Sequence, residues 1–167
     1  MRLPPPDGMD WDFGSGSSPS SSSTYNPQGV VYNTPGLKTI TLTVDNGNCT
    51  VSTTSTLTVE TTPTSGFSGT SLSCQGDTVL FANNSLSGQR YQWSFDLGGS
   101  SANPATSTLA SPTGVVYNVA GLKTVRVIAV NGNCSDTSMQ NLQVNASPVS
   151  SFTSTTPNCG NTGTNFT

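Results

Sequence analysis

Few side chains of this sequence could carry out chemistry, and they lie far apart along the chain. There is no histidine, which excludes mechanisms that need an imidazole as a base, proton shuttle or metal ligand. Asp10 and Asp12 flank Trp11 and form the only close pair of carboxylates. A glycosidase dyad needs a cleft around its two carboxylates, and a calcium ion needs several more oxygen ligands. We therefore expect two solvated aspartates, and we predict no catalytic residue, no cofactor and no metal site.

The hydroxyl and amine side chains give no stronger signal. Serine and threonine are abundant, but no base stands ready to activate one of their oxygens as a nucleophile. Lys38 and Lys123 each follow a Gly-Leu pair, and recurring lysines of this kind are candidates for an isopeptide crosslink. An exposed lysine at the start of a strand would instead discourage edge pairing between molecules, and we favour this role. The sequence therefore predicts a protein that is not an enzyme.

Charge and hydropathy exclude two classes of partner. The 5 Lys and Arg residues against 8 Asp and Glu give a net charge of −3, which is unsuited to a protein that neutralises nucleic-acid phosphates. No apolar run approaches the roughly 18 residues of a membrane-spanning helix. Residues 1–6 lack the apolar stretch of a signal peptide, so we expect a secreted precursor to be longer than the chain shown. Low charge with many β-branched residues favours strands over disorder.

The elements that position these side chains come from an internal repeat. Residues 29–39 return as residues 114–124, 85 positions later, and the Asn-Gly-Asn-Cys run that ends at Cys49 returns at the same offset. Trp11 returns as Trp93 after 82 positions, so the loop after the tryptophan differs by three residues. A repeat of this length is typical of one supersecondary unit that recurs along a chain.

The repeats are out of phase with the ends of the chain. Residues 1–62 hold a unit that lacks its first strands, residues 63–147 a complete unit, and residues 148–167 the opening strands of a further one. A second copy placed after Thr167 would bring its tryptophan 85 residues after Trp93, so the sequence tiles head to tail. Two arrangements fit: a longer covalent rod, which we favour, or donation of the opening strands by another molecule. Both predict a polymer or fibre of further copies.

Hydrophobic periodicity indicates strands and no helix. Threonines alternate with Ile40, Leu42 and Val44, which is the period of a half-buried strand. The Asn46-Gly47 pair that follows favours a hairpin turn. Several short strands per repeat, separated by turn residues, are typical of a two-sheet antiparallel sandwich. The expected core residues are Trp11, Trp93, Ile40, Leu42, Val125 and Val127.

At this point the sequence resembles a known family. The Asp-Trp-Asp-Phe-Gly-Ser-Gly run of residues 10–16, followed by Tyr32 and the Pro-Gly-Leu-Lys-Thr-Ile-Thr-Leu-Thr-Val run of residues 35–44, resembles the polycystic-kidney-disease (PKD) repeat. Ser15 stands where that family usually has a second aspartate, and Leu37 replaces its usual aromatic residue. The resemblance covers both units and implies an all-β fold of tandem immunoglobulin-like antiparallel β-sandwiches, usually strung along secreted and cell-surface proteins.

The fold implied by this resemblance suggests how the four cysteines pair. An immunoglobulin-like sandwich would place the start of the first strand and the last hairpin at the same end, so we predict a disulfide between Cys74 and Cys134. Cys49 and Cys159 would then pair across neighbouring copies. Four buried free thiols are the alternative, and a zinc site is disfavoured because the chain has neither a Cys-x-x-Cys motif nor a histidine. Disulfides would imply an oxidising compartment.

Composition and cysteine placement are also similar to repeats in large adhesins of gliding, type IX-secreting Bacteroidota. From this similarity we expect a structural repeat segment of an extracellular filament, stalk or adhesin shaft at a bacterial cell surface. Glycans or surface polysaccharide are further expected partners, and a carbohydrate- or protein-binding module of a secreted hydrolase is the alternative function. The candidate glycosylation sites are Thr78, in an Asp-Thr-Val motif, and Asn83 and Asn145, in Asn-x-Ser motifs.

Overall fold

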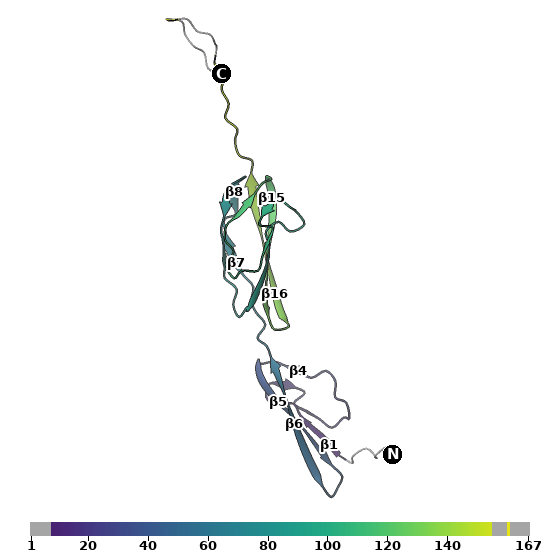
Figure 1. Cartoon of the computed structure of the whole chain (residues 1–167). Helices are drawn as coiled ribbons and strands as arrows, with labels where there is room; N and C mark the ends of the chain where they lie inside the picture. The colour runs from purple at the N-terminus through teal and green to yellow at the C-terminus, as the bar shows by residue number, and fades with distance from the viewer. Residues whose placement is uncertain (1–7, 155–159, 161–167) are drawn as a thin grey trace.

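The computed structural model describes residues 8–154 and residue 160. Its strands fall into two groups that lie end to end (Figure 1): unit 1 contains β1–β6, and unit 2 contains β7–β16. The pairing between strands is antiparallel with one exception, which confirms the predicted all-β class of immunoglobulin-like β-sandwiches. Among the described residues, no helix combines the length and apolar character needed to cross a membrane.

Unit 2 is built from two layers of strands. One layer is a sheet in the order β13-β11-β15-β16-β8, made of β13 (Thr106–Ser107), β11 (Arg90–Ser94), β15 (Gly121–Asn131), β16 (Cys134–Asn145) and β8 (Leu72–Cys74). The other layer holds the sheet β12-β14-β9 and the pair β10-β7, made of β12 (Ala102–Asn103), β14 (Val115–Tyr117), β9 (Thr78–Val79), β10 (Phe81–Asn83) and β7 (Phe67–Gly69).

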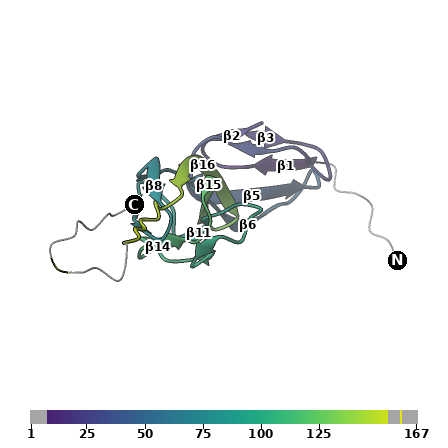
Figure 2. The same cartoon turned by 90° about the horizontal axis from the view of Figure 1, so that it is seen from above.

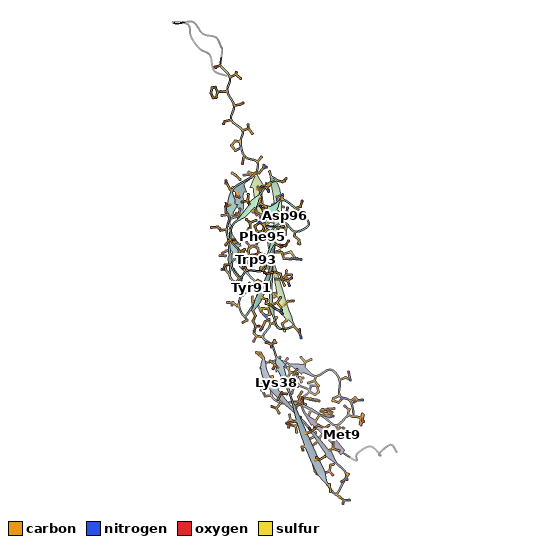
Figure 3. All side chains as sticks on the ribbon, viewed as in Figure 1. Met9, Lys38, Tyr91, Trp93, Phe95 and Asp96 are labelled. Atoms are coloured by element: carbon orange, nitrogen blue, oxygen red, sulfur yellow. The ribbon has the colours of Figure 1, made fainter. Side chains whose placement is uncertain are left out.

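The core of unit 2 lies between these layers and is centred on Trp93 and Phe95 (Figure 3). Every second residue of β15 from Lys123 onward is buried, because successive side chains of a strand point to opposite faces of the sheet. Trp93 is 2% exposed, and Val125 and Val127 are buried beside it. Three of the six residues expected in the core therefore lie in one buried cluster.

Unit 1 contains fewer strands than unit 2. Its main sheet has the order β3-β1-β5-β6, made of β3 (Ser21–Ser22), β1 (Gly8–Asp12), β5 (Gly36–Asp45) and β6 (Thr50–Val59), and β2 (Ser17–Ser18) pairs separately with β4 (Val31–Tyr32). Figure 2 shows β1, β5 and β6 running alongside one another. These six strands occupy the repeat positions of β11–β16, and the described residues hold no counterpart of β7–β10 in unit 1.

A buried tyrosine shows that the two units share local structure. The hydroxyl of Tyr117 donates a hydrogen bond of 2.7 Å to the carbonyl oxygen of Phe95. In unit 1 the hydroxyl of Tyr32 donates to the carbonyl oxygen of Phe13 over 2.9 Å. The same contact forms in both units because the tyrosine and the phenylalanine recur at matching repeat positions. Unit 1 therefore follows the same fold as far as its strands extend.

The structure corrects the predicted disulfide between Cys74 and Cys134. Cys74 ends β8 and pairs with Asn145, the last residue of β16, whereas Cys134 is the first residue of β16. The two cysteines therefore lie near opposite ends of that strand, about 36 Å apart at a rise of roughly 3.3 Å per residue. From the sequence, Cys74 was expected at the start of the first strand and at the same end of the unit as the last hairpin. In the structure β8 runs parallel to β16, so Cys74 lies beside the end of β16 that is far from the hairpin. Cys49, Cys74 and Cys134 are free thiols, and Cys159 lies outside the described residues.

The structure also corrects the expected exposure of the two lysines. Lys38 is 4% exposed and Lys123 is 7% exposed. Each lysine sits at an inward position near the start of its strand, so its ammonium group needs a polar partner inside the unit. The Nζ atom of Lys38 donates to the hydroxyl of Thr34 over 2.9 Å, and the Nζ atom of Lys123 lies 3.9 Å from Oδ2 of Asp96. Neither lysine is therefore an exposed residue that discourages edge pairing between molecules.

Candidate functional site

Unit 1 has an open apolar face. A hollow of about 530 Å³ lies beside Trp11 and Ile40, and a second hollow of about 190 Å³ adjoins it, sharing these two residues and adding Leu42. The larger hollow is lined by Trp11, Phe13, Asn26, Pro27, Gln28, Val30, Tyr32, Ile40 and Leu57. Most of this lining is apolar or aromatic, so its exposure to water is unfavourable.

The same positions are closed in unit 2. Leu57 is 42% exposed, whereas Leu142 at the matching repeat position is 1% exposed. Trp11 is half-buried and Trp93 is buried. Trp11, Ile40 and Leu42, which the sequence placed in a core, are therefore the floor of an open face. The strand pattern also shows this difference, because β5 has several half-buried residues in a row where β15 alternates cleanly.

Two phenylalanines account for the closure of unit 2. Phe67, on β7, meets the ring of Trp93 edge-on with ring centroids 5.3 Å apart. Phe81, on β10, stacks on Phe95 with centroids 5.5 Å apart. Both phenylalanines come from the group of strands that has no counterpart among the described residues of unit 1. The open face of unit 1 therefore corresponds to the surface that β7 and β10 cover in unit 2.

The other residues singled out from the sequence do not gather into a site. Asp10 and Asp12 are both exposed on β1, and Oδ1 of Asp12 accepts a hydrogen bond from the N–H of Gly14. The residues that the structure describes include no cluster of three or more groups able to hold a metal ion. Of the candidate glycosylation sites, Thr78 and Asn145 are exposed and Asn83 is half-buried.

The junction between the two units is held by polar contacts that the sequence did not reveal. Oδ2 of Asp136 accepts hydrogen bonds from the backbone N–H of Ser65, at 2.7 Å, and from its hydroxyl, at 2.9 Å. Nδ2 of Asn131 donates to the carbonyl oxygen of Thr61 over 2.8 Å. The β15–β16 hairpin of unit 2 is therefore fixed to the segment that leaves unit 1.

The Asp136 contact gives a testable prediction about the junction. Hydrogen bonds from the N–H and hydroxyl of Ser65, and from the N–H of Thr137, hold the pKa of Asp136 below its usual value. We expect Asp136→Ala to raise the amide hydrogen-exchange rate of Ser65 several-fold, because the acceptor is lost. Asp77→Ala, at the opposite end of unit 2, is the control. Unchanged exchange at Ser65 in the first variant would contradict the assignment.

A second polar network lies inside unit 2. Oδ2 of Asp96 accepts hydrogen bonds from the N–H and hydroxyl of Ser101, at 3.0 and 2.7 Å. Burial alone would raise the pKa of Asp96, but the Ser101 hydrogen bonds and the nearby Lys123 charge outweigh it and leave the pKa below its usual value. Burial, together with the Asp96 charge, raises the pKa of Tyr117 well above its usual range. This network holds a strand end in place.

Comparison with known proteins finds solved structures of similar fold but assigns the chain to no family. The chain matches no protein-family model and no curated protein. It is similar to the solved structure of the amphioxus IgVJ-C2 molecule, with 15% identity over 86% of this chain and 92% of that chain and a TM-score of 0.39. It is also similar to the fibronectin(III)-like modules of Clostridium thermocellum CbhA, with 11% identity over 87% of this chain and 82% of that chain and a TM-score of 0.40.

Proposed function

We propose that this chain is a structural repeat segment of an extracellular filament, stalk or adhesin shaft, in which each unit completes the next head to tail. The observation that carries the proposal is the open apolar face of unit 1. In unit 2 the strands that carry Phe67 and Phe81 cover the same positions and bury Trp93. A face of this kind gains stability when equivalent strands cover it, because apolar surface then leaves water.

The sequence that would cover the open face is present at the other end of the chain. Residues 148–167 repeat residues 63–82, and Phe152 and Phe166 stand at the positions of Phe67 and Phe81. The occupant of the face is therefore an opening segment of this same repeat. It comes either from a preceding unit of a longer chain or from residues 148–167 of another copy, as in strand donation. The same sandwich results in both cases.

The setting of such a shaft follows from the surface and from the PKD-like motifs. Only 8% of the residues are charged, and serine and threonine dominate the solvent side of β6. A neutral, hydroxyl-rich surface suits contact with glycans or lateral packing of shafts. The resemblance of residues 10–16 and 35–44 to PKD repeats supports a place outside the cell, and the similarity in composition and cysteine placement to Bacteroidota adhesins supports a bacterial surface. The partners in this proposal are further copies of the chain, with surface polysaccharide as a second class.

A synthetic peptide of residues 148–167 tests the proposal. We expect it to bind the full chain and to slow the amide hydrogen exchange of β4 and β6, because their counterparts in unit 2 pair with β9 and β8. A peptide with Phe152→Ser and Phe166→Ser is the matched control and should bind much more weakly. Light scattering should show that the chain without added peptide associates in a concentration-dependent way, and that excess peptide reduces this association.

Two chain variants locate the binding. Leu57→Asp places a charge in the apolar hollow and is expected to abolish peptide binding. Leu37→Asp lies on the neighbouring strand, is already 69% exposed and should leave binding unchanged. Two results would contradict the head-to-tail arrangement. The first is peptide binding that Leu57→Asp does not change. The second is a chain that stays monomeric at all concentrations and does not bind the peptide.

A second candidate function is a carbohydrate- or protein-binding module. The observation that favours it is the lining of the larger hollow, in which Trp11 and Tyr32 lie with the side chains of Asn26 and Gln28. Aromatic faces beside amide groups are able to bind a sugar ring. Titration with soluble oligosaccharides distinguishes the two functions. Saturable sugar binding that Leu57→Asp removes, without self-association of the chain, would favour the module.

A further inference from the structure

The cysteines lie at the two ends of a unit. Cys74 pairs with Asn145, where the chain leaves unit 2. The N–H of the next residue, Gln75, donates to the carbonyl oxygen of Asn145 over 2.8 Å, and the hydroxyl of Ser147 donates to the carbonyl oxygen of Gln75 over 2.6 Å. Cys74 is exposed, and its strand is fixed against the first residues of the segment that leads onward.

The hairpin cysteine lies at the opposite end, against the segment that arrives from unit 1. The β15–β16 hairpin turns through Gly132 and reaches Cys134. A Cβ atom on Gly132 would come within 2.8 Å of Cγ of Glu60, so the Glu60 side chain packs against this turn. Asn131, one residue before the turn, donates to the carbonyl oxygen of Thr61. The hairpin therefore rests on the residues that immediately follow unit 1.

The repeat brings these two observations together. Glu60 and Thr61 stand 85 residues before Asn145 and Ala146, so a hairpin that follows unit 2 would rest on Asn145 and Ala146. Cys74 and its strand are hydrogen-bonded to this same short segment. At a complete junction, the first-strand cysteine of one unit and the hairpin cysteine of the next unit thus both lie beside the residues that join the two units.

At the junction that the structure describes, one buried polar atom lacks the partner that a further strand would supply. Asn131 is 6% exposed, and its Oδ1 atom is buried without a hydrogen-bond partner among the described residues. A buried oxygen of this kind normally has a donor. The strand that would carry the first-strand cysteine of unit 1 is the element absent at this place, and its backbone supplies donors. Asn131 therefore points independently to a partner strand at the hairpin.

We propose that Cys74 forms a disulfide across the junction with the hairpin cysteine of the unit that follows. Each thiol loses its proton, a bond forms between the two sulfur atoms, and the two electrons pass to a disulfide oxidant such as oxidised glutathione, which is cleaved to two thiols. This disulfide links the side chains of successive units covalently, in addition to the link through the backbone. This pairing differs from the one expected from the sequence, because each bond spans two units and none closes a single unit.

For separate copies of this chain the partner is defined. The unit that begins at residues 148–167 is completed by residues 1–62 of a following copy, whose hairpin carries Cys49. This step rests on the head-to-tail arrangement proposed above. The predicted bond therefore joins Cys74 of one copy to Cys49 of the next. Both cysteines are exposed, so an oxidant can reach them.

Disulfide mapping of the full chain tests this bond. Equal amounts of ¹⁵N-labelled and unlabelled chain are assembled, oxidised with a glutathione redox buffer and digested with trypsin and a glutamate-specific protease. Cleavage after Lys38, Glu60 and Arg90 separates the peptide of Cys49 from that of Cys74. We expect a disulfide-linked pair of peptides 39–60 and 61–90, with labelled and unlabelled partners mixed. Non-reducing gels should show a ladder of oligomers that collapses with a thiol reductant.

Two variants complete the test. Cys74→Ser should remove the linked pair of peptides, whereas Cys134→Ser, the control, should leave it in place. Light scattering under reducing conditions reports head-to-tail assembly separately. Assembly in which Cys74 stays a free thiol, or pairs with Cys134 of the same chain, would overturn the disulfide and leave the proposed function standing. Absence of both assembly and the linked peptides would overturn both.

Discussion

Trp93→Ala is expected to lower the free energy of unfolding of unit 2 by about 3–5 kcal/mol, the usual cost of removing a fully buried large aromatic side chain. Trp93 is 2% exposed, and its ring lies within 5.9 Å of Phe95 and 5.3 Å of Phe67, centroid to centroid. Its Nε1 atom also donates a hydrogen bond of 3.0 Å to the carbonyl oxygen of Leu109. The substitution leaves a cavity and an unpaired carbonyl group at once.

The matched variant Trp11→Ala should cost much less, about 1–2 kcal/mol, because the side chain is only half-buried. Trp11 stacks on Phe13 at a centroid distance of 6.2 Å, and it also lines the open hollow. Urea unfolding followed at amide signals of β15 and β5 measures the two units separately. Equal losses in the two variants would contradict the open face. Added peptide 148–167 should raise the cost of Trp11→Ala towards that of Trp93→Ala.

The second large effect concerns the buried charge pair. Asp96→Ala should destabilise unit 2 by about 3–5 kcal/mol, because it leaves the Lys123 ammonium group buried without its carboxylate. The side chains of Lys123 and Asp96 are only 9% and 11% exposed, so little water is available to replace the lost partner. The variant also removes the acceptor of two hydrogen bonds from Ser101.

A double variant separates the charge from the packing. Asp96→Ala combined with Lys123→Met removes both charges and keeps an apolar side chain in the lysine position, so it should recover most of the lost stability. Urea midpoints of the parent chain and the two variants measure this recovery. A double variant as unstable as Asp96→Ala alone would show that the Ser101 hydrogen bonds, and not the uncompensated Lys123 charge, cause the loss.

The pH dependence of this pair has a defined sign. The pKa of Asp96 in the folded chain lies below the ordinary value of 3.8, so the folded state favours the ionised carboxylate. Its contribution to stability is complete above that ordinary value and is lost as the pH falls through the lowered pKa. The stability difference between the parent chain and Asp96→Asn should therefore shrink between pH 7 and the acid range. A difference that grows on acidification would contradict this sign.

Local pattern predicted the strands better than it predicted the partners of side chains. The alternation in residues 39–44 and the Asn-Gly turn led to the β5–β6 hairpin, because period and turn chemistry are local properties. The partners of Cys74 and Lys123 depend on strands far away in the sequence. The parallel pairing of β8 with β16 and the approach of Asp96 are set by the fold, and no short motif records them.

The open face of unit 1 could be predicted from the sequence only in part. The repeat count alone placed residues 1–62 without opening strands, so the absence of a cover over Trp11 could be expected from the sequence. Its consequence for Ile40 and Leu42 was missed, because the pattern of a strand reports which side is apolar and not whether another layer covers it. The junction contacts of Asp136 and Asn131 had no sequence signal beyond their place near a turn.

The parallel pairing of β8 and β16 also determines how unit 2 would respond to a pulling force. The chain enters unit 2 before β7 and leaves after β16, so tension between the ends draws β8 and β16 in opposite directions along their length. The hydrogen bonds from Gln143 to Ser71, at 2.9 Å, and from Gln75 to Asn145, at 2.8 Å, are then loaded in shear at the same moment. Bonds loaded together must break together, whereas a peeled strand loses them one at a time. The orientation of one three-residue strand therefore makes unit 2 resistant to unfolding by a force applied between its two ends.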